Sequence, residues 1–219
     1  MPGAARLLEA GCYYGKIDLQ NLETLFYPPE LVGIREAERD FGQPLRRNAR
    51  LVPSRTHAGG VYTYGLNRDA EIVMILPRPG GILLHRKEFY PEGAHRLLTG
   101  GVDEGESVVD AARREVREET GFSLQPERFL FHLRYPGKPG APKKGFHSLG
   151  FLFPYTDGEI RTEDLEEKIE SWDVADWPRF PDIILQLEDL NGGWLGWGRF
   201  RALAHSFLLE CRGAHPEWF

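Results

Sequence analysis

The sequence predicts an α/β fold, in which short strands precede and follow one strongly marked helix. Residues 72–76 form a continuous apolar run, and residues 82–87 form a second strand-like run after a Pro-Gly-Gly turn. A helix is predicted over 107–121. Two more strands are predicted over 129–135 and 147–155, where Leu and Phe recur.

The predicted helix has recognisable signals at both ends. Ser107 is followed three positions later by Asp110, which resembles a capping box, and Gly121 suits the left-handed position that ends a helix. A turn of about 100° per residue then sorts the side chains between these ends into faces. The arc predicted to face the core consists of Val109, Ala112 and Val116.

Three glutamates fall on the neighbouring arc of this helix: Glu115, Glu118 and Glu119. Like charges three and four residues apart repel one another, so a cation is expected to offset them. Carboxylate oxygens are hard ligands of the kind that Mg²⁺ and Mn²⁺ prefer. The alternative is a solvated acidic face whose partners are the arginines of the same helix.

The helix and the loop before it, Gly100 to Phe122, read GGVDEGESVVDAARREVREETGF. These 23 residues resemble the signature of the Nudix hydrolases, G-x5-E-x7-R-E-U-x-E-E-x-G-U, where U is apolar, at every fixed position. The strand, turn, strand, loop and helix order of residues 58–180 is similar to that family too. The resemblance implies an α/β/α sandwich with a mixed sheet, and hydrolysis of a nucleoside diphosphate linked to another group.

The resemblance also implies roles for individual residues. Glu115, Glu118 and Glu119 match the metal-binding glutamates, and Glu115 is a candidate general base as well. The carbonyl of Thr99, at the start of an expected Gly-rich loop, is a further candidate metal ligand. We place two more residues beside Glu115 in the catalytic set, because they pair to hold loop against helix in the family: Glu106 and Arg114.

Two later segments contain candidate substrate-binding residues. The first is a Pro/Gly-rich basic connection over 136–146, which is either a solvated loop or a flap over phosphates. Its lysines are Lys138, Lys143 and Lys144. The second is an acidic run over 163–172, which in some members of the family supplies a metal ligand or the general base. Solvated side chains are the alternative for each of its candidates: Glu166, Glu167 and Glu170.

The substrate that we favour is ADP-ribose or a nucleotide sugar. ADP-ribose-type members often carry a proline about fifteen residues after the signature, and Pro136 and Pro139 lie 14 and 17 residues after Phe122. Markers of the NADH, coenzyme A and dinucleoside polyphosphate types are not evident. The alternatives are a nucleoside-triphosphate pyrophosphatase and a non-catalytic, nucleotide-binding regulatory domain, which the intact glutamates disfavour.

Three regions are predicted: an N-terminal extension over 1–58, a catalytic domain over 59–180 and a C-terminal helical extension over 181–219. The first contains short predicted helices and a basic cluster, for which we favour a solvated linker over a phosphate contact: Arg46, Arg47 and Arg50. This extension is expected to pack on the domain, to cover its pocket or to make a homodimer contact. In the last region, helices are predicted over 181–190 and 200–211.

Composition limits the classes of partner. The net charge of −6 lacks the basic footprint of a nucleic-acid-binding protein, so we expect a small-molecule nucleotide partner and no nucleic acid. No stretch approaches 18 apolar residues and the first residues lack a signal-peptide layout, which predicts a cytoplasmic enzyme without membrane contact. Cys12 and Cys211 show no metal-ligand spacing and are expected to be reduced thiols.

Overall fold

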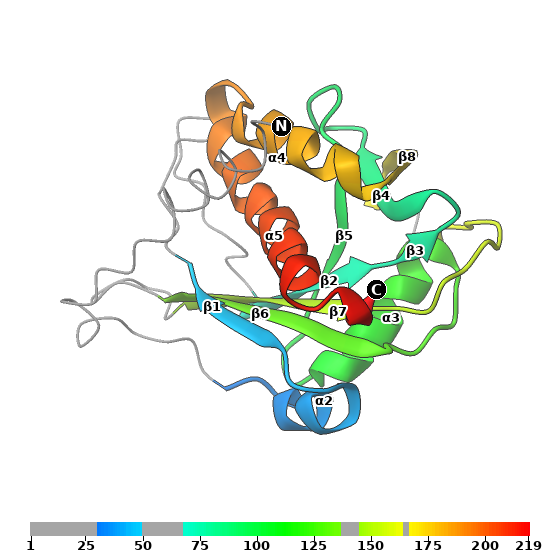
Figure 1. Ribbon diagram of the computed structural model, residues 1–219, viewed down its shortest axis with the longest axis vertical. Helices are drawn as coiled ribbons and strands as arrows, with labels where there is room; N and C mark the ends of the chain where they lie inside the picture. Colours follow the sequence, from blue (N-terminus) through cyan, green and yellow to red (C-terminus); the bar gives the residue numbers. More distant parts are fainter. Residues whose placement is uncertain (1–29, 50–67, 137–144, 164–166) are drawn as a thin grey trace.

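The computed structural model describes residues 30–49, 68–136, 145–163 and 167–219. They form a mixed sheet with helices on both faces (Figure 1). The helices and strands follow in the order α2 (Ile34–Phe41), β1 (Leu45–Asn48), β2 (Ala70–Ile75), β3 (Pro77–Arg78), β4 (Gly81–Lys87), β5 (Arg96–Gly101), α3 (Val108–Thr120), β6 (Arg128–Pro136), β7 (Gly145–Leu152), β8 (Ile169–Ala175), α4 (Phe180–Glu188) and α5 (Leu195–Ala214). Three 3₁₀ turns accompany the last helices, at Trp177–Arg179, Gly192–Trp194 and Pro216–Trp218.

The sheet has eight strands in the order β1-β6-β7-β2-β5-β4-β3, and β8 pairs with β4. Strand β1 runs parallel to β6, and β2 runs parallel to β7. The remaining pairs are antiparallel. Strand β2 lies between β7 and β5, so it has partners on both sides and its whole backbone is enclosed.

Strand β2 separates two hydrophobic clusters. Ile72 and Met74 pack with α2 and α3, whereas Val73 and Ile75 pack with α4 and α5. Successive side chains of a strand point to opposite faces. Because helices cover both faces here, residues 72–75 of β2 form a continuous apolar run rather than an alternating one. The predicted α/β/α arrangement with a mixed sheet and a C-terminal helix is confirmed (Figure 1).

The termini of α3 are those that the sequence predicts. The Ser107 side chain accepts hydrogen bonds from the backbone N–H groups of Val109 and Asp110, at 3.2 and 3.4 Å. Gly121 adopts a φ of 78° and ends the helix. The three residues predicted for the core arc are all buried: Val109, Ala112 and Val116.

Strand β5 is longer than expected, and it changes the position of the glycine-rich loop. Thr99, Gly100 and Gly101 pair with β2 as the last residues of β5, so the loop comprises only residues 102–107. The prediction of a loop from Thr99 onward is therefore wrong. Gly100 is required here because a Cβ would lie 1.8 Å from the carboxyl carbon of Glu115.

The acidic run contains a strand that the sequence did not predict. Strand β8 pairs with β4 at the edge of the sheet, with a register shift between Arg86 and Lys87. Of its seven residues only Ala175 is buried. An edge strand that buries so little shows no apolar period, so hydrophobic patterning cannot detect it.

Residues 30–49, which belong to the predicted N-terminal extension, pack on α3 and on strand β6. The Val108 N–H at the start of α3 donates to the carbonyl of Val32 at 3.0 Å, just before α2. Strand β1 extends the sheet, and its Arg46 and Arg47 form ion pairs with Glu38 and Glu210. These two arginines therefore lie in a strand and not in the favoured linker, although their side chains are exposed as that prediction had it. Arg50, Cys12 and the helices predicted before residue 30 lie outside the described residues.

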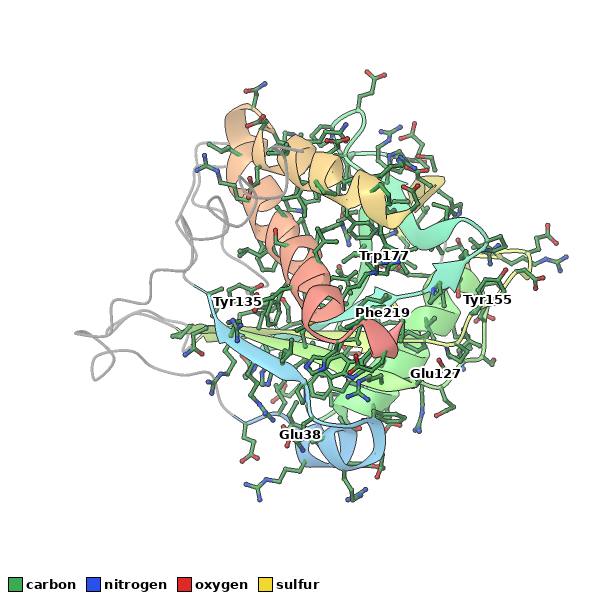
Figure 2. The ribbon with its side chains drawn as sticks, viewed as in Figure 1. Glu38, Glu127, Tyr135, Tyr155, Trp177 and Phe219 are labelled. Atoms are coloured by element: carbon green, nitrogen blue, oxygen red, sulfur yellow. The ribbon has the colours of Figure 1, made fainter. Side chains whose placement is uncertain are left out.

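The last two helices cover the sheet face opposite α3. Helix α5 begins five residues before the predicted start. Its Gly198 packs directly on α4, since a Cβ there would lie 2.0 Å from the Leu187 carbonyl oxygen. The C-terminal Phe219 packs edge-on against Trp177, with ring centroids 5.2 Å apart (Figure 2). Cys211 is a buried free thiol. Among the helices described, none is both long enough and apolar enough to cross a membrane.

Candidate active site

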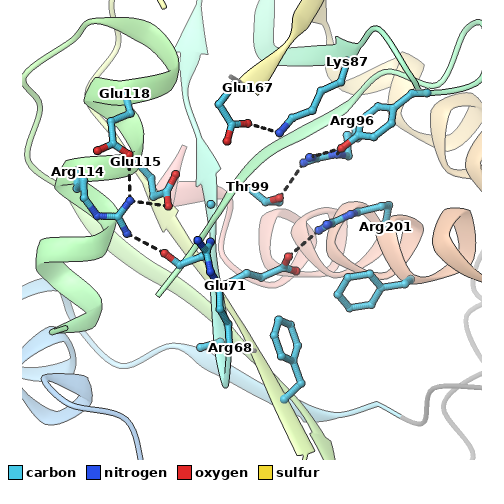
Figure 3. A pocket seen from close by; sticks show the side chains of 16 residues that line it. Arg68, Glu71, Lys87, Arg96, Thr99, Arg114, Glu115, Glu118, Glu167 and Arg201 are labelled. Carbon is cyan, nitrogen blue, oxygen red and sulfur yellow. Dashed lines mark hydrogen bonds and ion pairs between the residues drawn. The ribbon is translucent and has the colours of Figure 1, made fainter. Parts of the chain in front are cut away.

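A pocket of about 300 Å³ lies where α3, the ends of β2 and β5, and α5 meet (Figure 3). Glu115 and Glu118 line one wall, and both come from α3. The opposite wall carries cationic groups from three different elements: Lys87, Arg96 and Arg201. A site with carboxylates on one wall and cations on the other can hold a metal ion and an anionic ligand together.

Arg114 joins the acidic wall to the loop before α3. Its Nε and Nη2 donate to the two oxygens of Glu106, each at 2.8 Å, and Nη2 also donates to the carbonyl of Gly101 at 2.8 Å. Its Nη1 donates to Glu115 at 2.8 Å and to Glu118 at 3.0 Å (Figure 3). One guanidinium therefore offsets the repulsion among three carboxylates and fixes the loop to the helix.

The same contacts shift the pKa values of these groups. The hydrogen bonds from Arg114 lower the pKa of Glu106, although burial opposes the change. Burial raises the pKa of Glu115 more than Arg114 lowers it. The pKa of Arg114 is raised, mainly by its hydrogen bonds to Glu106. Of the two carboxylates that contact Arg114 most closely, Glu115 is thus the stronger base.

Glu119 lies beneath the pocket rather than on its wall. Its side chain is fully buried, and neither oxygen has a hydrogen-bond partner within the described part of the chain. The closest basic group is Nδ1 of the equally buried His85, 3.7 Å from a Glu119 oxygen. Burial raises the pKa of Glu119 to about 8. A carboxyl group in this state requires either a proton or a cation.

These side chains fit a hard divalent cation. Within the described ranges, no three His, Cys, Asp or Glu side chains already stand close enough together to hold a metal ion. The donors are nevertheless carboxylate oxygens, which suit Mg²⁺ or Mn²⁺. The two unpartnered oxygens of Glu119 point to the same kind of ligand, because leaving them charged and unpaired in the interior is costly.

The acidic run contributes one carboxylate to the pocket and places another outside it. Glu167 lines the pocket and pairs with Lys87, whereas Glu170 pairs with Arg86 at 2.6 Å and does not line the pocket. Lys168 between them has a φ of 51°, which is uncommon for a residue with a side chain. The chain turns there, so that Glu167 faces Lys87 (Figure 3).

Buried polar side chains support the cationic wall. Arg201 of α5 donates to Glu71 of β2 at 2.6 Å, and Ser148 donates to the other Glu71 oxygen at 2.7 Å. His205, one turn further along α5, accepts a hydrogen bond from the Leu97 N–H at 3.0 Å. These contacts attach α5 to β5 and hold Arg201 at the pocket.

Several pocket residues were not predicted from the sequence. They are Arg68, Glu71, Lys87, Tyr90, Arg96, Phe146, Phe200 and Arg201. They come from strands, loops and the last helix, and no shared spacing connects them. A charged residue at the start of a strand, as Arg96 is at the start of β5, was the signal available. Of the predicted substrate residues, Lys138, Lys143, Lys144 and Glu166 lie outside the described residues.

Comparison with known proteins gives one family. The NUDIX domain model matches residues 66–195, well over half of the chain. An NAD-capped RNA hydrolase NudC from Haemophilus influenzae (strain PittGG) is 34% identical over 147 residues, which are 66% of this chain and 49% of that protein. The NudC of Klebsiella pneumoniae is 32% identical over 114 residues, 52% of this chain and 40% of its own. The chain thus spans about half the length of the curated relatives that it matches, or less.

Solved structures resemble the chain more loosely. A MutT protein from Methanosarcina mazei has a TM-score of 0.41 at 15% identity, and the match covers 65% of this chain and 97% of that one. An ADP-ribose pyrophosphatase from Streptococcus suis has a TM-score of 0.37 at 17% identity, and the match covers 64% of this chain and 90% of that one.

Most of α5 lies beyond residues 66–195, the range that the NUDIX domain model matches. The helix nevertheless supplies two residues of the pocket, Phe200 and Arg201.

Proposed function

Because the chain belongs to the NUDIX family, we propose that it is a divalent-metal-dependent hydrolase of the diphosphate linkage in nucleoside diphosphate derivatives. The pocket is the observation that carries this proposal. The carboxylates of Glu115 and Glu118 lie on one wall of this cavity of about 300 Å³, and the cationic groups of Lys87 and Arg201 lie on the other. A diphosphate bound between these walls would bring its charge to both a metal ion and the basic side chains.

Glu115, Glu118 and Glu119 would hold Mg²⁺ or Mn²⁺, with the carbonyl of Thr99 as a further ligand. A metal ion bound there would neutralise charge on the phosphate oxygens and acidify a coordinated water. Glu119 is the internal ligand, since its buried oxygens have no partner among the described residues. Glu118 is partly exposed and would be the ligand nearest to the substrate.

The remaining residues would position substrate and water. Glu115 is our candidate general base, because burial raises its pKa and it lies at the pocket wall. Glu167 is the alternative base from the acidic run, and Lys87 holds it in place. Arg114 and Glu106 would keep the loop and the signature helix at a fixed distance. Lys138, Lys143 and Lys144 remain predicted phosphate contacts.

The substrates that we favour are ADP-ribose and nucleotide sugars, and nucleoside triphosphates are the second choice. The names of the curated relatives add another candidate that the sequence had disfavoured, the NAD cap of an RNA. All of these contain a diphosphate linkage, so one site chemistry would serve them. They differ in the group beyond that linkage, which must lie at or outside the mouth of the pocket.

A substrate panel tests the proposal. Purified protein with Mg²⁺ or Mn²⁺ is incubated with ADP-ribose, a UDP-sugar, ATP, NAD and an NAD-capped RNA oligonucleotide, and the products are identified by mass. We expect cleavage of a diphosphate linkage with release of a nucleoside monophosphate. Tight nucleotide binding without cleavage of any substrate would favour the non-catalytic regulatory domain instead.

A further inference from the structure

Tyr90 presents a hydrogen-bond donor to the pocket. It lies in the loop between β4 and β5, and it lines the pocket with only 8% of its surface exposed. Its phenol oxygen accepts hydrogen bonds from Nε and Nη2 of Arg96, at 3.2 and 2.7 Å. A phenol oxygen accepts two hydrogen bonds and donates one. The proton of Tyr90 must therefore point away from Arg96.

Most donors of Arg96 are committed to protein partners. Four of its five N–H groups are used: Nη1 donates to the carbonyl of Leu97 at 2.7 Å and to the Thr99 hydroxyl at 2.9 Å, and Nε and Nη2 each donate once to Tyr90. Its side chain is fully buried. Its guanidinium polarises the Tyr90 hydroxyl that it contacts, which makes the O–H of Tyr90 a stronger hydrogen-bond donor.

The orientation of the Tyr90 ring is fixed. Its centroid lies 4.5 Å from that of Trp197 and 6.2 Å from that of Trp194. Within the described part of the chain, no acceptor receives the Tyr90 O–H. The pocket lining carries five Lys and Arg side chains against four carboxylates, so its formal net charge is positive and favours an anion.

From these contacts we infer that the Tyr90 hydroxyl donates a hydrogen bond to a non-bridging phosphate oxygen of the bound nucleotide. The inference rests on the proposed function and adds a substrate-binding residue to it, with Arg96 as the positioning residue. Burial acts to raise the pKa of Tyr90, but Arg96, Arg201 and Lys87 outweigh it, so the pKa is lowered. A more acidic phenol is a stronger hydrogen-bond donor to phosphate.

The test compares two matched substitutions. Tyr90→Phe removes the donor and keeps the ring, whereas Tyr155→Phe removes the hydroxyl of an exposed tyrosine that does not line the pocket. Calorimetry measures the Kd of each variant for α,β-methylene-ADP with Mg²⁺, and kcat/KM is measured on the best panel substrate. We expect Tyr90→Phe to weaken binding and lower kcat/KM about 10- to 100-fold, and Tyr155→Phe to change each less than about threefold.

Two further measurements separate the explanations. Tyr90→Phe leaves donors of a buried arginine without acceptors, so unfolding midpoints are recorded, and the comparison is repeated in an Arg96→Met background where that charge is absent. If Tyr90→Phe binds the probe and hydrolyses substrate like its parent protein, which is the wild type in one comparison and Arg96→Met in the other, the role of Tyr90 is overturned and the proposed function is not. Wild-type protein that neither binds the probe nor cleaves any substrate overturns the proposed function, and this inference with it.

Discussion

The three glutamates of α3 have different surroundings although they share one helix. Glu118 is partly exposed and pairs with Arg114, whereas Glu119 is buried without a hydrogen-bond partner among the described residues. We predict that Glu118→Gln and Glu119→Gln each lower kcat by about 10²–10⁴-fold, because each removes charge from the proposed metal site. Steady-state kinetics with Mg²⁺ measures this.

Asp110→Asn is the control for these variants. Asp110 belongs to the same helix but pairs with Arg113 outside the pocket, so kcat should stay within about twofold. Without metal, Glu119→Gln should be at least as stable as the wild type near pH 8, since it no longer buries an ionisable carboxyl group. Near-normal kcat in both glutamine variants would show that this face is not the metal site.

His205 makes stability depend on pH. Its ring accepts from Leu97 and bonds to the Arg201 carbonyl, and burial lowers its pKa from 6.5 to about 4. Between these values the unfolded chain binds a proton that the folded chain does not. The free energy of unfolding should therefore fall by roughly 3 kcal/mol as the pH drops from 6.5 to 4.

Urea unfolding of His205→Gln across this range isolates the effect, since other buried histidines titrate in both proteins. Glutamine does not titrate, so the difference between wild type and variant should narrow as the pH falls. At pH 7 the variant should be less stable, because it disrupts buried hydrogen bonds. A constant difference from pH 7 to pH 4 would mean that the pKa of His205 is not lowered in the folded protein.

Residues are predictable where the chain itself supplies the context. Glu106, Arg114 and Glu115 stand at fixed spacings in one signature, and the structure brings them into contact. Arg96 and Arg201 are about a hundred positions apart, and their place at one pocket depends on how α5 docks on β5. Helical periodicity placed Glu118 and Glu119 on one arc. It gives the angular position of a side chain around the helix axis but not how far other elements cover it, so the burial of Glu119 was not predictable.

The contact between α2 and α3 should be sensitive to substitution at Gly33. Gly33 precedes α2 with a φ of 77°, and a Cβ there would lie 2.7 Å from the Oγ of Ser107, the residue that caps α3. Gly33→Ala should lower the free energy of unfolding by about 2 kcal/mol or more. It combines left-handed strain of about 1 kcal/mol with displacement of the cap, worth about another 1 kcal/mol.

Gly93→Ala is a matched control for this prediction. Gly93 has a φ of 76°, and nothing lies within 4 Å of the position of its Cβ. It carries the backbone strain without the contact, so urea denaturation should show a loss of only about 1 kcal/mol. If the two variants lose the same free energy of unfolding, the contact between Gly33 and Ser107 contributes nothing to stability.

Elements were predictable when they were enclosed. Strands β2 and β7 lie inside the sheet and bury every residue, and α3 carries signals at both of its ends. Strands β1 and β8 lie at edges of the sheet and expose polar side chains. The sequence of β1 therefore resembles a linker, and that of β8 resembles a solvated acidic segment. Strand β5 was shortened in the prediction because glycines usually mark loops, whereas here one of them makes room for Glu115.

The stability of the whole molecule should depend on metal. A ligand that binds only the folded state stabilises it, by about 2.7 kcal/mol at a hundredfold excess over Kd. Mg²⁺ or Mn²⁺ should therefore raise the Tm of the wild type, and EDTA should abolish both the shift and the hydrolysis. Differential scanning calorimetry of Glu118→Gln should show a much smaller shift. Full activity in chelator would exclude the metal mechanism.

The docking of α5 on the sheet sets an order of assembly during synthesis. The β2–β5 pair and α3 are close in sequence and can associate early, whereas β2 must wait for β7 to fill its other side. Arg201 and Phe200 leave the ribosome after every other residue that lines the pocket. Nucleotide therefore cannot bind the complete pocket before these two residues emerge, and the β2–β5 pair and α3 must associate without help from the ligand.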